Sequence, residues 1–258
     1  MGGATAIMLL FYFADQGVLK DHRYMDQVPH SVAPDLWVVE QPFKLPYVRV
    51  EIGSRMTCIR LRNGQLLLHS PIKLDSVLRC SLDALGEIGV VIAPNKFHHL
   101  FLAPYVASYP KARVYAAPSL SKKRPDLRFD GELGDEPEEE WRGQIEQHLF
   151  CGAPALSEVV FFHPATQTLI LTDLAFNIPL QAAEKSPLFR WLWDVGRFGP
   201  HRFVRRRGIR DRQAAQKSVR RILNWNFDRI IVSHGEVLET GGREKFAAAF
   251  AFLTNPEY

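Results

Sequence analysis

Three apolar segments of the 258-residue chain run directly into side chains that can bind a metal ion, and this feature most constrains the fold. The segments read VVIAPNKFHH, TLILTD and RIIVSHGE, and they end near His98–His99, Asp173 and His234. Short apolar runs bounded by Pro, Gly or polar residues are typical of buried strands. Since polar residues at strand ends gather at one rim of a sheet, we expect these side chains to lie together.

The rest of the pattern predicts two groups of strands with helices between them. The first group is an antiparallel meander, because Asn63-Gly64 is a hairpin turn between two apolar runs. Leucines and valines recur at helical spacing over residues 74–85. We expect strands at 36–40, 48–53, 57–62, 66–68, 90–93, 112–117, 158–163, 168–173 and 229–233, and helices at 74–85, 100–109, from about 211 and at 243–253.

Composition places the chain among ordinary globular proteins and suggests a reducing compartment. Hydrophobic residues make up 47% and charged residues 23%, with a net charge of +4, which favours an anionic partner only weakly. The three cysteines form no C-x-x-C pair, so we expect no disulfide framework and a cytoplasmic location. We expect an N-terminal extension over residues 1–35 and a single domain over 36–258.

The apolar run Ala4–Ala14 is too short to span a bilayer, which takes about 20 residues. It also lacks the basic segment that begins a signal peptide. We interpret it as a terminal element packed on the body, and a peripheral membrane contact is the alternative. The acidic segment 132–146 is interpreted as a solvated surface insertion.

Two or more histidines with a carboxylate are ligands for zinc, iron or manganese. An open coordination position on such an ion holds a water molecule whose pKa falls toward about 7. That water can attack an ester, thioester, amide or phosphodiester. Neither nucleotide-binding nor Gly-x-Ser-x-Gly patterns occur in the chain, so metal-assisted hydrolysis is the chemistry that the sequence favours.

The order of these motifs resembles the metallo-β-lactamase superfamily, from about Leu36 to the end of the chain. More narrowly, APNKFHHLFL and FFHPATQTLILTDL resemble a branch of that superfamily with a domain of unknown function. The resemblance implies an α/β fold, an αββα sandwich of two mixed sheets flanked by helices. It also implies a metal site at the rim of the sandwich.

The chain departs from the superfamily's first motif, Thr-His-x-His-x-Asp-His. Set against that motif, Ala93 replaces the Thr, Pro94 and Lys96 replace the first two His, His98 stands at the Asp and His99 at the last His. Gly152-Ala153-Pro154 stands where a third His is expected, while Asp173 and His234 match the later Asp and the final His. The resemblance therefore implies one divalent ion at most, held by His98, His99, Asp173 and His234. A degenerate member that holds no metal is the alternative.

Basic residues near the predicted site suggest an anionic substrate. Lys96 stands at a vacated ligand position and would steady an anionic group, with Asn95 beside it in contact with substrate. Residues 190–221 contain eleven Lys and Arg against Asp194 and Asp211, with the triplet Arg205-Arg206-Arg207 at their centre. We interpret this segment as a solvated helix face partly paired with residues 132–146. The alternatives are a lid over an anionic substrate and a surface for acidic lipid or nucleic acid.

The sequence thus favours a metal-dependent hydrolase with a reduced, mononuclear site and a small-molecule or anionic substrate. Asp173 and Lys96 would be the catalytic side chains, and Asn95, Lys96 and Arg205–Arg207 would bind substrate. A non-catalytic protein that binds an anionic ligand or partner through the basic segment is the second hypothesis. A role in nucleic-acid processing is a third and weaker one, and no transmembrane segment is expected.

Overall fold

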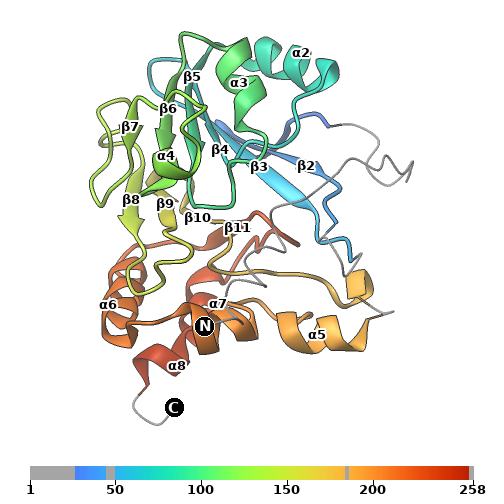
Figure 1. Cartoon of the computed structure of the whole chain (residues 1–258), viewed down its shortest axis with the longest axis vertical. Coiled ribbons are helices and arrows are strands. Elements are labelled where there is room, and N and C mark those ends of the chain that lie inside the picture. Colours follow the sequence, from blue (N-terminus) through green and yellow to red (C-terminus); the bar gives the residue numbers. More distant parts are fainter. Residues whose placement is uncertain (1–26, 45–49, 184–185, 256–258) are drawn as a thin grey trace.

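Two mixed β-sheets pack face to face, with helices on both outer faces (Figure 1). The structure is a computed structural model that describes residues 27–44, 50–183 and 186–255. The run Ala4–Ala14 and residues 48–49 of a predicted strand lie outside the described residues. The predicted αββα sandwich is confirmed.

The first sheet has the order β1-β2-β3-β4-β5-β6-β7 and the second β11-β10-β9-β8. Strands β1 to β4 are antiparallel neighbours, as expected of a meander, and β4 to β7 run parallel. In the second sheet only β10 and β11 are parallel. The strands are β1 (His30–Ala33), β2 (Leu36–Gln41), β3 (Ser54–Arg60), β4 (Leu66–His69), β5 (Ile88–Ala93), β6 (Arg113–Ala116), β7 (Gly131–Glu132), β8 (Glu146–Leu149), β9 (Val159–His163), β10 (Thr168–Leu171) and β11 (Arg229–Val232).

Helices α2, α3 and α4 cover the outer face of the first sheet, and α6, α7 and α8 cover that of the second, with α5 beside them (Figure 1). Asp75 and Asp211 cap α2 and α6 by accepting hydrogen bonds from Leu78 N and Ala214 N. The helices are α2 (Ser76–Leu85), α3 (Leu102–Ser108), α4 (Leu120–Lys123), α5 (Pro187–Trp193), α6 (Arg212–Leu223), α7 (Gly242–Ala249) and α8 (Ala251–Thr254). Short turns are η2 (Pro164–Thr166), η3 (Leu180–Ala183) and the π-helical η4 (Val204–Gly208). No helix of the described residues is long and apolar enough to cross a bilayer.

Strand alternation sorts the apolar side chains of the two sheets into three of the four hydrophobic clusters of the described residues. Successive side chains of a strand point to opposite faces. In β5, Val90 and Ile92 enter the core between the sheets, whereas Val91 and Ala93 face α2 and α3. In β9, Val159 and Phe161 face the first sheet, and the alternate residues face α6 and α8. Strands β4, β5, β9 and β10 are therefore buried on both sides, which explains their largely apolar sequences.

Three local predictions differ from the structure. Residues 50–53 form no strand and only an isolated bridge between Lys44 and Glu51. The acidic segment 132–146 is not wholly solvated, because Trp141 and Ile145 are fully buried between the sheets. Strand β1, inside the predicted extension, is paired with β2.

Arg55 joins the two sheets beside their shared rim. Its buried guanidinium on β3 donates to the carbonyl of Val232 at the end of β11 and to that of Gly235 at 2.7 Å. The Nε group donates to Glu40 at 2.9 Å. The Arg55 side chain thus donates to two carbonyls at and beyond the end of β11, and the carboxylate of Glu40 balances its charge.

We expect Arg55→Met to lower the free energy of unfolding by roughly 2–3 kcal/mol, because it leaves two carbonyls and a carboxylate without their donor. Urea unfolding measures the change. The matched control is Arg113→Met, whose side chain is 60% exposed with carboxylates no closer than 3.8 Å; there the loss should stay under about 1 kcal/mol. Equal losses in the two variants would contradict the sheet-joining role.

Candidate metal centre

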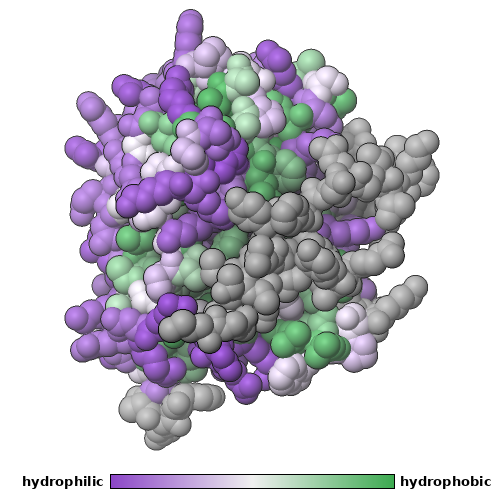
Figure 2. All heavy atoms as spheres, in the orientation of Figure 1, coloured by the Kyte–Doolittle hydropathy of each residue, from purple (hydrophilic) through white to green (hydrophobic). Residues whose placement is uncertain are grey.

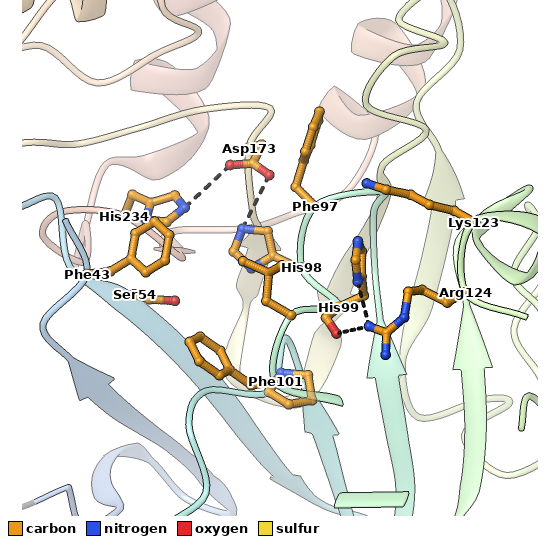
Figure 3. Close-up of a pocket in the computed structure, with 12 residues that line it drawn as sticks. Phe43, Ser54, Phe97, His98, His99, Phe101, Lys123, Arg124, Asp173 and His234 are labelled. Atoms are coloured by element: carbon orange, nitrogen blue, oxygen red, sulfur yellow. Dashed lines mark hydrogen bonds and ion pairs between the residues drawn. The ribbon is translucent and has the colours of Figure 1, made fainter. Parts of the chain in front are cut away.

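Three of the four predicted ligands meet at the rim of the sandwich. His98 lies in the turn after β5, Asp173 follows β10 and His234 follows β11. Since β10 and β11 are parallel neighbours, Asp173 and His234 leave the second sheet at the same edge. One ligand atom from each of the three side chains lies within 4.8 Å of the others. Figure 3 shows both imidazoles pointing at the carboxylate.

The distances between the imidazoles and the carboxylate are compatible with binding of one shared ion. His98 Nε2 lies 3.3 Å from Asp173 Oδ2, and His234 Nε2 lies 3.4 Å from Asp173 Oδ1. Charge-assisted hydrogen bonds are usually about 2.7–2.9 Å long. Ligand atoms of a tetrahedral zinc site, with bonds of about 2.0–2.2 Å, lie roughly 3.3–3.5 Å apart. Both distances are therefore long for charge-assisted hydrogen bonds and close to the ligand–ligand spacing of a zinc site, and each ends on a different oxygen of Asp173.

The other ring nitrogen of each histidine has its own partner. Ser70 Oγ lies 2.6 Å from His98 Nδ1, and His234 Nδ1 lies 2.6 Å from the carbonyl oxygen of Gly53. Such contacts fix the ring and present the opposite nitrogen to an ion. Ser70 is fully buried, so its hydroxyl orients His98 and is inaccessible to a substrate.

The buried side-chain amide of Asn95 forms hydrogen bonds that hold the metal-binding side chains in place. Its Nδ2 donates to Asp173 Oδ2 at 2.7 Å and to Thr172 Oγ1 at 2.8 Å. Its Oδ1 accepts from the backbone N–H groups of Phe97 and His98, both at 2.8 Å. We expected Asn95 to contact substrate, but it is fully buried and its amide is engaged in positioning two of the ligands.

Glu158 is a functional residue that the sequence did not reveal. Its buried carboxylate accepts from three consecutive backbone N–H groups: Thr172 at 2.8 Å, Asp173 at 2.7 Å and Leu174 at 2.9 Å. It therefore fixes the turn that carries Asp173. A charged residue directly before the apolar strand β9 was the only clue, and it equally suits an exposed strand end.

The pKa values of Asp173 and His98 are shifted in opposite directions. Burial raises the pKa of Asp173, but His98 and His234 outweigh burial and hold that pKa well below its usual range. Burial lowers the pKa of His98, but Asp173 and Glu158 outweigh it and raise the pKa above its ordinary value. Burial and the Asp173 carboxylate raise the pKa of Glu158. The ionised carboxylate of Asp173 is the form that binds a cation.

His99, the fourth predicted ligand, does not join the cluster. Its Nδ1 lies 3.1 Å from the guanidinium of Arg124, which also donates to the His99 carbonyl at 3.3 Å. Burial, Lys123 and Arg124 lower the pKa of His99 to about 4. Figure 3 shows the ring beside Arg124, on the far side of the cavity from Asp173. The structure thus brings together His98, Asp173 and His234 only.

Lys96 and Arg205–Arg207, which we predict to contact substrate, do not line the cavity beside the cluster. The Lys96 ammonium donates to the Pro154 carbonyl at 3.0 Å and so bridges the two segments that replace the superfamily's other histidines. Arg205 faces Asp194 and Phe252 near α8, and Arg205–Arg207 do not line the cavity at the metal centre. Among the described residues, no ion pair joins segment 190–221 to segment 132–146, because Arg202 and Arg205 pair with Asp194 instead.

A cavity of about 240 Å³ opens onto the cluster. His98, Asp173 and His234 form one wall, and Lys123 and Arg124 of α4 and the turn after it form another (Figure 3). Its other lining residues are largely apolar: Phe43, Ser54, Pro71, Phe97, His99, Leu100 and Phe101. The cavity thus combines a metal-capable wall, a cationic wall and an apolar surface, as small-molecule sites commonly do.

His69 lies behind His98 in the core between the sheets. Neither ring nitrogen has a partner among the described residues, and the ring meets Phe161 edge-on at 5.1 Å. Burial, with a contribution from His98, lowers the pKa of His69 to about 3. His69 is therefore neutral in the folded protein at any pH near neutrality.

Comparison with known proteins identifies the fold. Residues 34–122, about a third of the chain, match the family model described as Domain of unknown function (DUF4336). A metallo-β-lactamase from Pontibacter korlensis superposes with a TM-score of 0.60 at 12% identity, covering 88% of this chain and 98% of that one. The mono-zinc form of the metallo-β-lactamase FIM-1 from Pseudomonas aeruginosa gives 0.60 at 11% identity, covering 88% and 96%.

A metal-soaked Flv1 flavodiiron core from Synechocystis sp. PCC6803 gives a TM-score of 0.61 at 12% identity, covering 90% of this chain and 62% of that one. A comparison with curated proteins found no match. The chain has the metallo-β-lactamase fold, and at such identities the likeness establishes the fold alone.

We expect Asn95→Ala to weaken zinc binding by about 10- to 100-fold although all three ligands remain, because Asp173 and the His98 turn lose their fixed orientation. Competition with a chromogenic chelator measures the affinity. Asn63→Ala, in an exposed hairpin turn, is the matched control and should leave it unchanged. Unchanged affinity in Asn95→Ala would show that the amide does not position the ligands.

We expect His69→Leu to reduce the loss of stability in acid. The unfolded chain takes up a proton at His69 below pH 6.5, whereas the folded chain does so only near pH 3, so stability falls as the pH falls through this window. Between pH 7 and 4.5 the wild-type protein should lose about 2–3 kcal/mol more than the variant. Urea midpoints at the two pH values measure this, and equal losses in both proteins would contradict it.

Proposed function

We propose that the protein is a hydrolase that uses a single divalent metal ion held by His98, Asp173 and His234. The observation that carries the proposal is the convergence of two imidazoles and one carboxylate at 3.3 and 3.4 Å, each ring fixed from behind. Two nitrogens and one oxygen suit zinc, iron or manganese. Three protein ligands with an open position are typical of catalytic rather than structural sites.

A single ion is favoured over two. The positions that hold a second ion in the superfamily are occupied by Pro94, Lys96 and the turn Gly152–Pro154. The hydrogen bond from Lys96 to the Pro154 carbonyl ties these segments together and places a positive charge there. A cation repels a second metal ion at short range, which supports the mononuclear centre of our proposal.

A divalent ion in such a site supplies Lewis acidity, which lowers the pKa of a water molecule and polarises a substrate oxygen. The residues of the chain itself orient the three side chains that would bind the ion. His98 and His234 keep Asp173 ionised. Asn95 and Glu158 fix the position of Asp173, while Ser70 and the Gly53 carbonyl hold the imidazoles. The apolar residues of the cavity limit access of bulk water to the reacting group.

The cavity favours a small substrate with an apolar part and a negative charge. A volume of about 240 Å³ excludes polymers from full enclosure. Lys123 and Arg124 replace Lys96 and Arg205–Arg207 as the cationic side chains beside the centre. Lys123 donates to the Lys96 carbonyl at 2.8 Å, and Arg124 is paired with Asp126 at 2.7 Å. An ester, thioester, amide or phosphodiester remains within this class.

A metal-free relative that binds a ligand is the second candidate. The observation behind it is that Asp173 and His98 already neutralise each other, because the pKa of one is lowered and that of the other is raised. Such a cluster is stable without an ion. In that case the cavity or the basic segment would bind an anion without turning it over.

We expect His98→Ala, Asp173→Ala and His234→Ala each to reduce bound metal to below about a tenth of wild type, since each removes one of three ligands. His99→Ala should keep most of the metal. Elemental analysis of protein purified without chelator measures this. Metal loss in His99→Ala equal to that in the other three would restore the four-ligand arrangement.

Activity is measured with 4-nitrophenyl acetate and bis(4-nitrophenyl) phosphate, before and after treatment with a chelator and after re-addition of zinc, iron or manganese. Wild type should lose hydrolysis with its metal and regain it, whereas Asp173→Ala should not. A wild-type protein that binds none of these metals would sink the hydrolase proposal and favour the metal-free candidate.

A further inference from the structure

A second surface, on the helical layer below the second sheet, carries exposed apolar side chains. Leu188 and Trp191 of α5 are 68% and 52% exposed. They lie three residues apart and therefore on one side of the helix. Phe189, on the opposite side, is buried. In Figure 2 hydrophobic spheres gather over the position of α5, with hydrophilic spheres along the lower edge of the molecule.

Arginines lie beside these apolar side chains, and Asp194 is the one carboxylate among the described residues that line the same surface. Asp194 is already engaged by Arg202 at 2.7 Å and by Arg205 at 3.7 Å. Two other arginines of the surface, Arg190 and Arg197, are exposed and form no ion pair with any described residue. The surface is therefore strongly positive next to its exposed leucine and tryptophan.

Two hollows join Trp191 and four arginines, Arg190, Arg197, Arg202 and Arg205, into one continuous face. One, of about 370 Å³, is lined by Arg190, Trp191 and Arg202, and the other, of about 640 Å³, by Arg205 and Lys245. Both include Asp194 and Arg197, so they are neighbours. Neither shares a residue with the cavity at the metal centre. We call this face, from α5 through η4 to Lys245, the basic face.

We propose that the basic face binds the surface of an anionic phospholipid bilayer. Arginines attract acidic headgroups, and the hollows give phosphate groups a place beside them. A leucine and a tryptophan that project among arginines fit the boundary between headgroups and acyl chains. Nucleic acid would satisfy the arginines, but it offers nothing to a projecting leucine. The inference is independent of the metal centre.

The binding should be weak and reversible, because few apolar side chains of the described residues project here: Leu188, Trp191 and the 47% exposed Leu180, which lies against Gly196. The test is co-sedimentation of the full chain with vesicles of phosphatidylcholine alone and with 30% phosphatidylserine, at 50 and 500 mM NaCl. We expect binding only to the serine-containing vesicles, at least tenfold weaker at the higher salt concentration.

Two double variants separate charge from insertion. Leu188→Ser with Trp191→Ser, and Arg190→Glu with Arg197→Glu, should each weaken binding at least tenfold. The matched charge control is Lys111→Glu with Lys122→Glu, two exposed lysines outside the basic face, and the matched apolar control is Val77→Ser on α2, which is 53% exposed. Both controls should stay within twofold of wild type, and circular dichroism verifies that each variant is folded.

The proposal is overturned if wild type does not bind serine-containing vesicles, or if either double variant binds as well as its control. It is also overturned if a single-stranded RNA of mixed sequence is bound through the same arginines while vesicles are not. Metal content and hydrolysis should be unchanged in all these variants, so failure of this proposal is distinguishable from failure of the hydrolase proposal.

Discussion

The buried carboxylate of Glu158 organises the region on which the metal centre depends. It directly precedes β9 and accepts hydrogen bonds from three consecutive backbone N–H groups that follow β10. A buried N–H without an acceptor costs about 1–3 kcal/mol, so the turn with Asp173 has one strongly favoured conformation. Asn95 then connects this turn to the one after β5. One buried acceptor thus couples the ends of three strands.

The sandwich explains why those strand ends meet. Parallel strands carry their carboxyl ends to one edge, and both sheets contain a parallel portion, β4 to β7 and β10 to β11. The inter-sheet core, with Ile92, Phe161 and Ile231, sets the two sheets against each other. Arg55 closes the rim by bonding the first sheet to the carbonyls of Val232 and Gly235. His234 lies between those two residues, so packing of the sheets fixes its position.

The strand-end principle was sufficient to predict His98, Asp173 and His234 as neighbours, because strand direction places them at one edge whatever the details of the turns. It could not separate His98 from His99. The side chains of adjacent residues in a tight turn point in different directions. The His99 ring is oriented toward Arg124, which lies 25 positions away in the sequence. Asn95 turned inward for a similar reason, since its partners Asp173 and Thr172 become neighbours only in the fold. The αββα architecture needed only the alternation of strands and helices, whereas these side-chain directions needed the packed structure.

Either a proton or a metal ion can balance the buried negative charge of the cluster. Asp173 and Glu158 are both buried, and a buried negative charge requires a nearby positive one. A proton on His98 answers that need in part, which is why the pKa of His98 is raised despite burial. A divalent ion held by His98, Asp173 and His234 would balance that charge more fully, and it would do so only with His98 deprotonated, because an imidazole ligand must be neutral. The same carboxylates that stabilise the metal-free cluster therefore provide the attraction for an ion, and the fixed rings mean that little reorganisation accompanies the exchange.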